Sequence, residues 1–114
     1  MSIEEYRFGH MKVDGRSFKD DIKIINGEIK PDWWRKTGHS IEAADVEDVL
    51  AADPDVFVLG TGNSGNVRVP EEFRKKLEQR GIELIAEPTE QAAKTYEKLK
   101  SEGRNVAAGF HLTC

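Results

Sequence analysis

The stretch VFVLGTGNSG, residues 56–65, joins an unbroken apolar run to a glycine-rich segment. Four successive apolar residues without alternation are typical of a strand that is buried on both faces. Such strands belong to parallel sheets whose faces are covered by helices. The glycine-rich segment marks the place where this strand ends and the backbone turns tightly. The stretch therefore predicts an α/β fold.

The remaining second half of the chain alternates between helix and strand patterns. Helices are predicted to begin at Asp45, Pro70 and Thr89, with Asp45 and Thr89 as their caps. Strands are predicted over 82–86 and 105–110. Because parallel strands need crossover connections, this alternation predicts a largely parallel sheet between layers of helices.

The first third of the chain has the composition of β structure. The sequence predicts one strand over 6–13, closed by a turn at Asp14-Gly15. Asn26-Gly27 then predicts a two-residue hairpin loop, which places Ile24 opposite Ile29. We expect this N-terminal β hairpin to be an appendage to the main sheet.

Length and composition indicate a single domain, residues 1–114. The net charge is −4, and Lys and Arg are balanced by acidic neighbours, so we expect no nucleic-acid partner. No apolar run approaches 18 residues and the acidic start lacks the apolar segment of a secretory signal. With Cys114 as the single cysteine, these features predict a cytoplasmic protein with no membrane association. We expect a monomer or weak homo-oligomer, although no sequence feature determines the oligomeric state.

The segment from Gly60 to Gly65 matches the G-x-G-x-x-G pattern of dinucleotide-binding proteins, and Glu87 lies where an acid would meet the ribose. In such sites the helix opens within the glycines, so that its N–H groups meet the pyrophosphate. Here the next helix is predicted to begin only at Pro70. We therefore treat nucleotide binding as a minor possibility and expect no cofactor; a structural role for Gly60 and Gly62 is favoured.

A third interpretation of this loop is a ligand cleft at the carboxyl ends of the strands, where open α/β sheets bind their ligands. Free N–H donors at the predicted helix start would suit a carboxylate or phosphate. The predicted lining residues are polar or small: Gly60, Thr61, Gly62, Asn63, Thr89, Lys36 and His39.

Two adjacent tryptophans, Trp33 and Trp34, precede Arg35. In an extended chain, alternation sends one of the two inward and leaves the other near the surface. Tryptophan and arginine often carry the binding energy of protein interfaces. Trp33, Trp34 and Arg35 are therefore the predicted interaction surface, and packing of one tryptophan between hairpin and sheet is the alternative.

His111 and Cys114 are the remaining candidates for metal binding or thiol catalysis. Residues three apart in a strand point to opposite faces, so these two side chains are not expected to converge. A zinc site needs three or four ligands, and only His10 and His39 remain as nitrogen donors. We predict no metal site and no catalytic residues.

Several short motifs together resemble one known family. They are Arg7-Phe8-Gly9, Trp34-Arg35 before Gly38-His39, Gly60-Thr61-Gly62, Thr89-x-x-Ala92 and the ending from Phe110 to Cys114. Across essentially the whole chain, their order resembles the Mth-domain proteins. That family comprises the adipogenesis-associated Mth-domain protein and its archaeal and bacterial relatives, with a mitochondrial complex I assembly factor as a distant member.

The resemblance implies a three-layer α/β/α fold with a mixed, mostly parallel central sheet and an N-terminal β hairpin. It also implies that the last strand runs antiparallel to its neighbours. It supplies no reaction. The function we expect is a non-enzymatic interaction or assembly module with an unidentified protein partner. The alternative is a small-molecule or anion-binding protein, or an enzyme, that uses the cleft at Gly60–Gly65 and Thr89.

Overall fold

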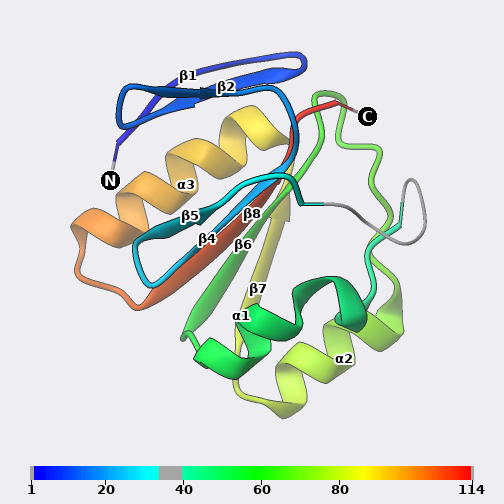
Figure 1. Cartoon of the computed structure of the whole chain (residues 1–114). Coiled ribbons are helices and arrows are strands. Elements are labelled where there is room, and N and C mark those ends of the chain that lie inside the picture. Colours follow the sequence, from blue (N-terminus) through cyan, green and yellow to red (C-terminus); the bar gives the residue numbers. More distant parts are fainter. Residues whose placement is uncertain (1, 34–39, 114) are drawn as a thin grey trace.

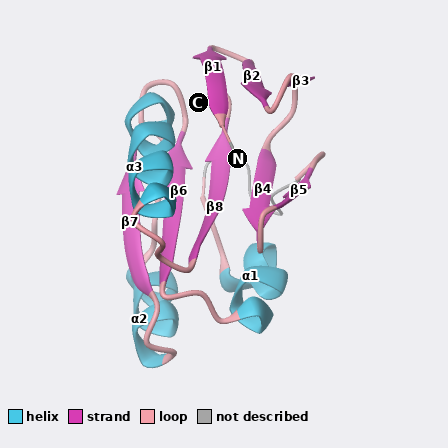
Figure 2. Cartoon of the chain, turned by 90° about the vertical axis from the view of Figure 1, so that its left-hand side faces the viewer, coloured by secondary structure: helices cyan, strands magenta, loops and turns pink. Residues whose placement is uncertain are grey.

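The computed structural model describes residues 2–33 and 40–113. Within these residues, eight strands and four helical segments are arranged in layers (Figures 1 and 2). The strands are β1 (Ile3–Arg7), β2 (His10–Val13), β3 (Arg16–Phe18), β4 (Ile22–Ile25), β5 (Glu28–Lys30), β6 (Val56–Thr61), β7 (Glu83–Glu87) and β8 (Val106–His111). The helices are the 3-10 helix η1 (Ala43–Val46), α1 (Glu47–Ala52), α2 (Glu71–Gln79) and α3 (Thr89–Ser101).

The central sheet has five strands in the order β5-β4-β8-β6-β7. β6 is parallel to both of its neighbours, β7 and β8, whereas β4 is antiparallel to β5 and to β8. The predicted mixed α/β sheet is confirmed. The expectation for the last strand holds on one side only, because β8 is antiparallel to β4 but parallel to β6.

Two apolar cores lie on the two faces of this sheet. On one face, α3 and the small sheet β1-β2-β3 share a core with β4, β6 and β8. On the other face, α1 and α2 pack against residues of β4, β6 and β8 that point the opposite way. The predicted buried strand is β6, in which the side chains of residues 56–59 are fully buried. These layers confirm the predicted three-layer arrangement, and α1 and α2 lie on the far side of the sheet from α3 (Figure 1).

The predicted single strand over 6–13 is wrong. A turn at Phe8-Gly9 divides it into β1 and β2, which pair antiparallel with Arg7 opposite His10. Gly9 has φ +73°, a backbone conformation that glycine adopts at no steric cost. The turn at Asp14-Gly15 is present and leads into β3, so the N-terminal residues form a separate three-stranded sheet.

The hairpin at Asn26-Gly27 has the predicted register, with Ile24 opposite Ile29 and Lys23 opposite Lys30. Its predicted place as an appendage is wrong, because β4 pairs with β8 and thereby extends the central sheet. Asn26 and Gly27 both have positive φ, as a type I′ loop requires.

The predicted helix cap at Asp45 is also corrected. Asp45 lies inside η1, is buried, and accepts a hydrogen bond from the Glu42 amide at 2.8 Å. Glu42 is therefore the N-cap of this 3-10 helix. The predicted start of α2 at Pro70 is confirmed within one residue, because Pro70 is its N-cap. None of the described helices is long and apolar enough to cross a membrane.

Trp33 fills the space between η1 and the face of the sheet. Its side chain is 6% exposed, its indole Nε1 donates to the Asp45 carbonyl at 3.0 Å, and its ring lies over Gly109 of β8. Lys23 from β4 lies 5.5 Å from the ring centroid and forms an ion pair with Asp48 of α1 at 2.8 Å. The packing role that the sequence left as an alternative therefore falls to Trp33.

Replacing Gly109 by alanine should destabilise the fold through Trp33. A Cβ at this position would lie 2.9 Å from the indole, closer than real contacts allow, and 3.1 Å from the Phe57 ring, which is tighter than most real contacts. Overpacking of a filled core costs about 1–3 kcal/mol. Chemical denaturation should show a loss of this size. A Gly109→Ala variant as stable as wild type would contradict the proposed fit.

Candidate functional site

Thr89 connects three elements at the carboxyl end of the central sheet. Its side chain is fully buried; its Oγ1 accepts a hydrogen bond from the Gly62 amide at 2.9 Å and donates one to the His111 carbonyl at 2.5 Å. Its own amide donates to the Gly62 carbonyl at 3.0 Å. The predicted capping role is wrong, because Pro88 is the N-cap of α3 and the Thr89 hydroxyl bonds to the ends of β6 and β8 instead.

The contacts around Thr89 explain the glycines of the G-x-G-x-x-G segment, Gly60, Gly62 and Gly65. A Cβ on Gly60 would lie 2.8 Å from Thr89 Oγ1 and 3.0 Å from the Phe110 ring. Gly62 and Gly65 have φ of +103° and +70°, which side chains rarely allow. Gly65 also lies against Pro88, the residue before α3. Close packing and backbone conformation therefore account for the glycines.

The remaining elements of a dinucleotide site are arranged differently here. No helix begins at Gly65. The next helix, α2, begins at Glu71 after an extended segment. Glu87, the acid that would meet a ribose, accepts a hydrogen bond from the Thr95 hydroxyl at 2.6 Å. The helix whose N–H groups hold a pyrophosphate in such sites therefore does not begin within these glycines.

The structure brings together Gly60, Thr61, Gly62 and Thr89 of the predicted cleft. Thr61 is buried like Thr89, whereas Asn63 is exposed and its amide donates to the Thr113 carbonyl at 2.7 Å. Lys36 and His39 lie outside the described residues. The amides of Gly62 and Thr89, which a ligand there would need, already bond within the protein. The cleft stays a prediction from the sequence.

A second polar group lies on the other side of β8. The carboxylate of Asp21 lies 3.0 Å from His111 Nδ1 through one oxygen and accepts the Leu112 amide at 2.8 Å through the other. The His111 ring is fully buried and stacks on Trp33, with centroids 4.5 Å apart. Sequence reasoning missed Asp21, which lies 90 residues from His111 and belongs to no motif.

This aspartate–histidine pair resembles the base and orienting acid of an enzyme, but its burial argues against that use. A general base must come within hydrogen-bonding distance of its substrate. The imidazole is covered by the Trp33 ring, so the pair anchors the end of β8. Among the described residues, no group of three His, Cys, Asp or Glu side chains is arranged to hold a metal ion. Cys114 lies outside the described residues.

The β1–β2 hairpin is fixed to the C-terminal segment by its own polar groups. The Gly9 amide donates to the Leu112 carbonyl at 2.8 Å, and the Tyr6 hydroxyl donates to the same carbonyl at 3.0 Å. Burial raises the pKa of Tyr6, and the charges of Asp21 and Glu90 raise it further, so the phenol remains a donor at neutral pH. Between these anchors, Phe8 is 65% exposed.

Of the predicted interaction residues, the structure describes Trp33 alone, and it is buried. Trp34 and Arg35 lie outside the described residues. Phe8 was not selected from the sequence as a surface residue, because the turn at Phe8-Gly9 was missed. Gly9 was the available signal for that turn. Among the described residues, Phe8 is the large hydrophobic side chain that is exposed.

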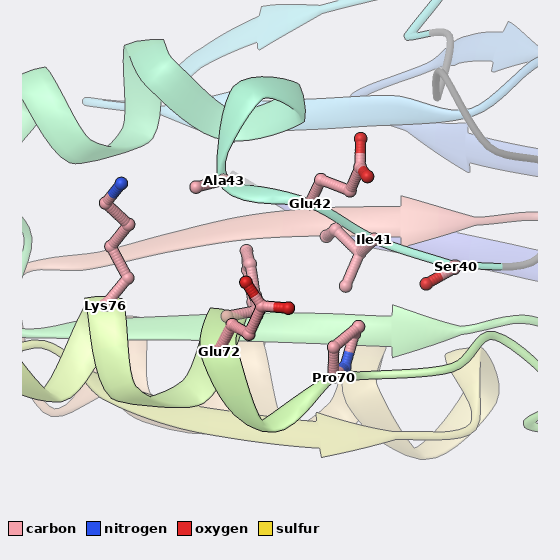
Figure 3. Close-up of a pocket in the computed structure, with 8 residues that line it drawn as sticks. Ser40, Ile41, Glu42, Ala43, Pro70, Glu72 and Lys76 are labelled. Atoms are coloured by element: carbon pink, nitrogen blue, oxygen red, sulfur yellow. The ribbon is translucent and has the colours of Figure 1, made fainter.

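A hollow of about 200 Å³ lies between residues 40–43 and the beginning of α2 (Figure 3). The Ile41 amide donates to the Arg68 carbonyl at 3.1 Å, which holds the two walls together. Buried Ile41 and Phe73 form its apolar part, and Glu72 and Lys76 of α2 are polar groups on its lining. Sequence reasoning did not find this hollow, because it depends on a tertiary contact.

Comparison with known proteins gives the family. Residues 3–111 match the model of a protein family of unknown function, DUF498/DUF598. A conserved hypothetical protein from Pyrococcus horikoshii OT3 is 35% identical, with a TM-score of 0.87 over 100% of both chains. The structure named MT938 is 28% identical, with a TM-score of 0.83 over 99% of this chain and 98% of the other. The resemblance to Mth-domain proteins is confirmed.

More distant neighbours share the fold. A Mth938-like domain protein from Bordetella pertussis is 21% identical, with a TM-score of 0.69 over 97% of this chain and 85% of the other. At this identity the likeness concerns the fold alone.

Replacing Thr89 by valine should destabilise the protein strongly. Valine keeps the shape but leaves the buried Gly62 amide and the His111 carbonyl without the hydroxyl. Each buried group deprived of its partner costs about 1–3 kcal/mol. Chemical denaturation measures the loss.

The matched controls are Thr95→Val and Thr89→Ser. Thr95 lies on the same helix, but its hydroxyl bonds the side chain of Glu87 rather than two strand ends, so its loss should be smaller. Serine keeps the hydroxyl at position 89 and should restore most of the stability. Equal stability of the Thr89→Val variant and wild type would show that the junction contributes little.

Proposed function

The chain belongs to the DUF498/DUF598 family, and we propose that it is a non-enzymatic interaction or assembly module that binds a protein partner through the tip of its β1–β2 hairpin. The observation that carries this proposal is the exposure of Phe8 at a tip that is held in place. We also place the protein in the cytoplasm, as its composition predicts.

The chemistry of the tip suits an interface. Aromatic side chains and arginine are enriched in protein interfaces, and Phe8 is preceded by Arg7, whose side chain is 70% exposed. Arg7 has a loose ion pair of 3.8 Å with the exposed Glu5, which contributes little and leaves the guanidinium accessible. A phenylalanine at this position offers a partner a large apolar area.

Rigidity of the tip favours binding as well. Gly9 and Tyr6 on either side of Phe8 both bond the Leu112 carbonyl. A backbone segment that is already held in place loses less conformational entropy when a partner binds it. The hairpin therefore presents Phe8 at low entropic cost.

The polar groups of the core support a non-catalytic role. His111 is covered by Trp33, and the Thr89 hydroxyl is bonded on both sides. The alternative, an anion-binding cleft at Gly60–Gly65 and Thr89, needs donors that these contacts occupy. A thermal-shift titration with phosphate and with nucleotides tests that alternative, since saturating ligand stabilises the protein that binds it.

Replacing Phe8 by alanine should abolish capture of the partner while leaving the fold intact. The exposed ring contributes little to the core, whereas loss of a hot-spot residue of an interface weakens binding by about 2 kcal/mol or more, a factor of about thirty. The measurement is quantitative affinity capture with cross-linking from cells of the source. Circular dichroism and thermal melting confirm that the fold is unchanged.

Lys19→Ala is the matched control, because Lys19 is also exposed and follows the same small sheet. The double variant Trp34→Ala, Arg35→Ala tests the surface predicted from the sequence in the same assay. An identical set of captured proteins for Phe8→Ala and Lys19→Ala would refute the role of the hairpin tip.

A further inference from the structure

The hollow between residues 40–43 and α2 is lined by one acidic and one basic side chain of α2, Glu72 and Lys76, which do not pair with each other. Glu72 and Lys76 are one helical turn apart, in the order that favours an ion pair. In the part of the chain that the structure describes, neither takes part in an ion pair within 4 Å. Figure 3 shows the Glu72 carboxylate pointing across the hollow, with Lys76 at one end and the Ser40 hydroxyl toward the other.

The wall between these polar groups is apolar and fixed. Ala43 and Pro70, the N-cap of α2, are the partly exposed apolar residues of the lining, whereas Ile41 and Phe73 are buried in the core. The parallel bridge between Ser40 and Arg68 joins the upper wall to the segment that leads into α2. An aliphatic chain can therefore lie on a preformed apolar surface with its polar ends near the charged groups.

We infer that this hollow binds a small zwitterion, a molecule that bears an ammonium and a carboxylate on a short aliphatic chain. The ammonium is held by Glu72 and the Ser40 hydroxyl, and the carboxylate by Lys76. The aliphatic part lies on Ala43 and Pro70. This site is separate from the hairpin tip, so neither proposal depends on the other.

Charge and size disfavour the other ligand classes. Figure 3 shows the Glu42 carboxylate turned away from the hollow, so Glu72 is the acid that repels a simple anion there. Lys76 repels a simple cation at one end. A volume of about 200 Å³ lies below the range of about 300–1,000 Å³ typical of sites for drug-sized molecules, which also excludes a dinucleotide.

The test is a titration of the isotope-labelled protein followed by amide NMR spectra. The probes are L-leucine and 5-aminopentanoate as zwitterions, n-butylamine as the cation and butyrate as the anion. We expect saturable shifts at Ile41, Ala43 and Phe73 with a zwitterion, and binding at least tenfold weaker for the singly charged compounds. Saturation by leucine assigns an α-amino acid, and saturation by 5-aminopentanoate alone assigns a ligand with more widely separated charges.

Glu72→Gln should weaken binding of the zwitterion at least tenfold. Glu71→Gln is the matched control, because Glu71 belongs to the same helical turn but lines a different hollow, next to β7. Unchanged amide shifts in β6 and β8 show that both variants are folded. The inference is overturned if neither zwitterion saturates, if butylamine or butyrate binds as well, or if Glu72→Gln binds like wild type.

Discussion

The hydroxyl of Thr89 is the interaction on which the carboxyl end of the sheet depends. It ties the end of β6, through the Gly62 amide, to the end of β8, through the His111 carbonyl. The residue that provides it is the first of α3, so one side chain fixes two strands and a helix. Gly60 lacks a side chain because that hydroxyl and Phe110 occupy the space. The glycine-rich loop follows from this constraint.

The segment after β8 extends the same construction to the small sheet. The Leu112 carbonyl accepts from Gly9 and Tyr6, and its amide donates to Asp21. The Thr113 carbonyl accepts from Asn63 in the glycine-rich loop. Three regions far apart in the sequence therefore bond to main-chain groups of two successive residues. The exposed Phe8 is held in position because its hairpin is attached to this segment.

The sequence predicts correctly those elements whose signals lie in neighbouring residues. The apolar run of β6, the loop at Asn26-Gly27 and the start of α2 at Pro70 were predicted correctly, because each rests on neighbouring residues. The pairing of β4 with β8 and the contact of Asp21 with His111 were not predicted, since both join residues about 90 positions apart. The family resemblance supplied the mixed sheet. Alternation predicted that one of the two tryptophans is buried, and Trp33 is buried against the Asp45 carbonyl.

The same sequence pattern arises here from a different physical cause than in nucleotide-binding proteins. In those proteins glycines let a phosphate approach the backbone and the start of a helix. Here the groups that approach are Thr89, Phe110 and Pro88 of the protein itself. Polar groups that are satisfied internally have little to offer a ligand, because binding would first have to break their bonds. Function is therefore to be sought where groups remain accessible, at Phe8 and around Glu72, outside the edge of the sheet that the motif indicates.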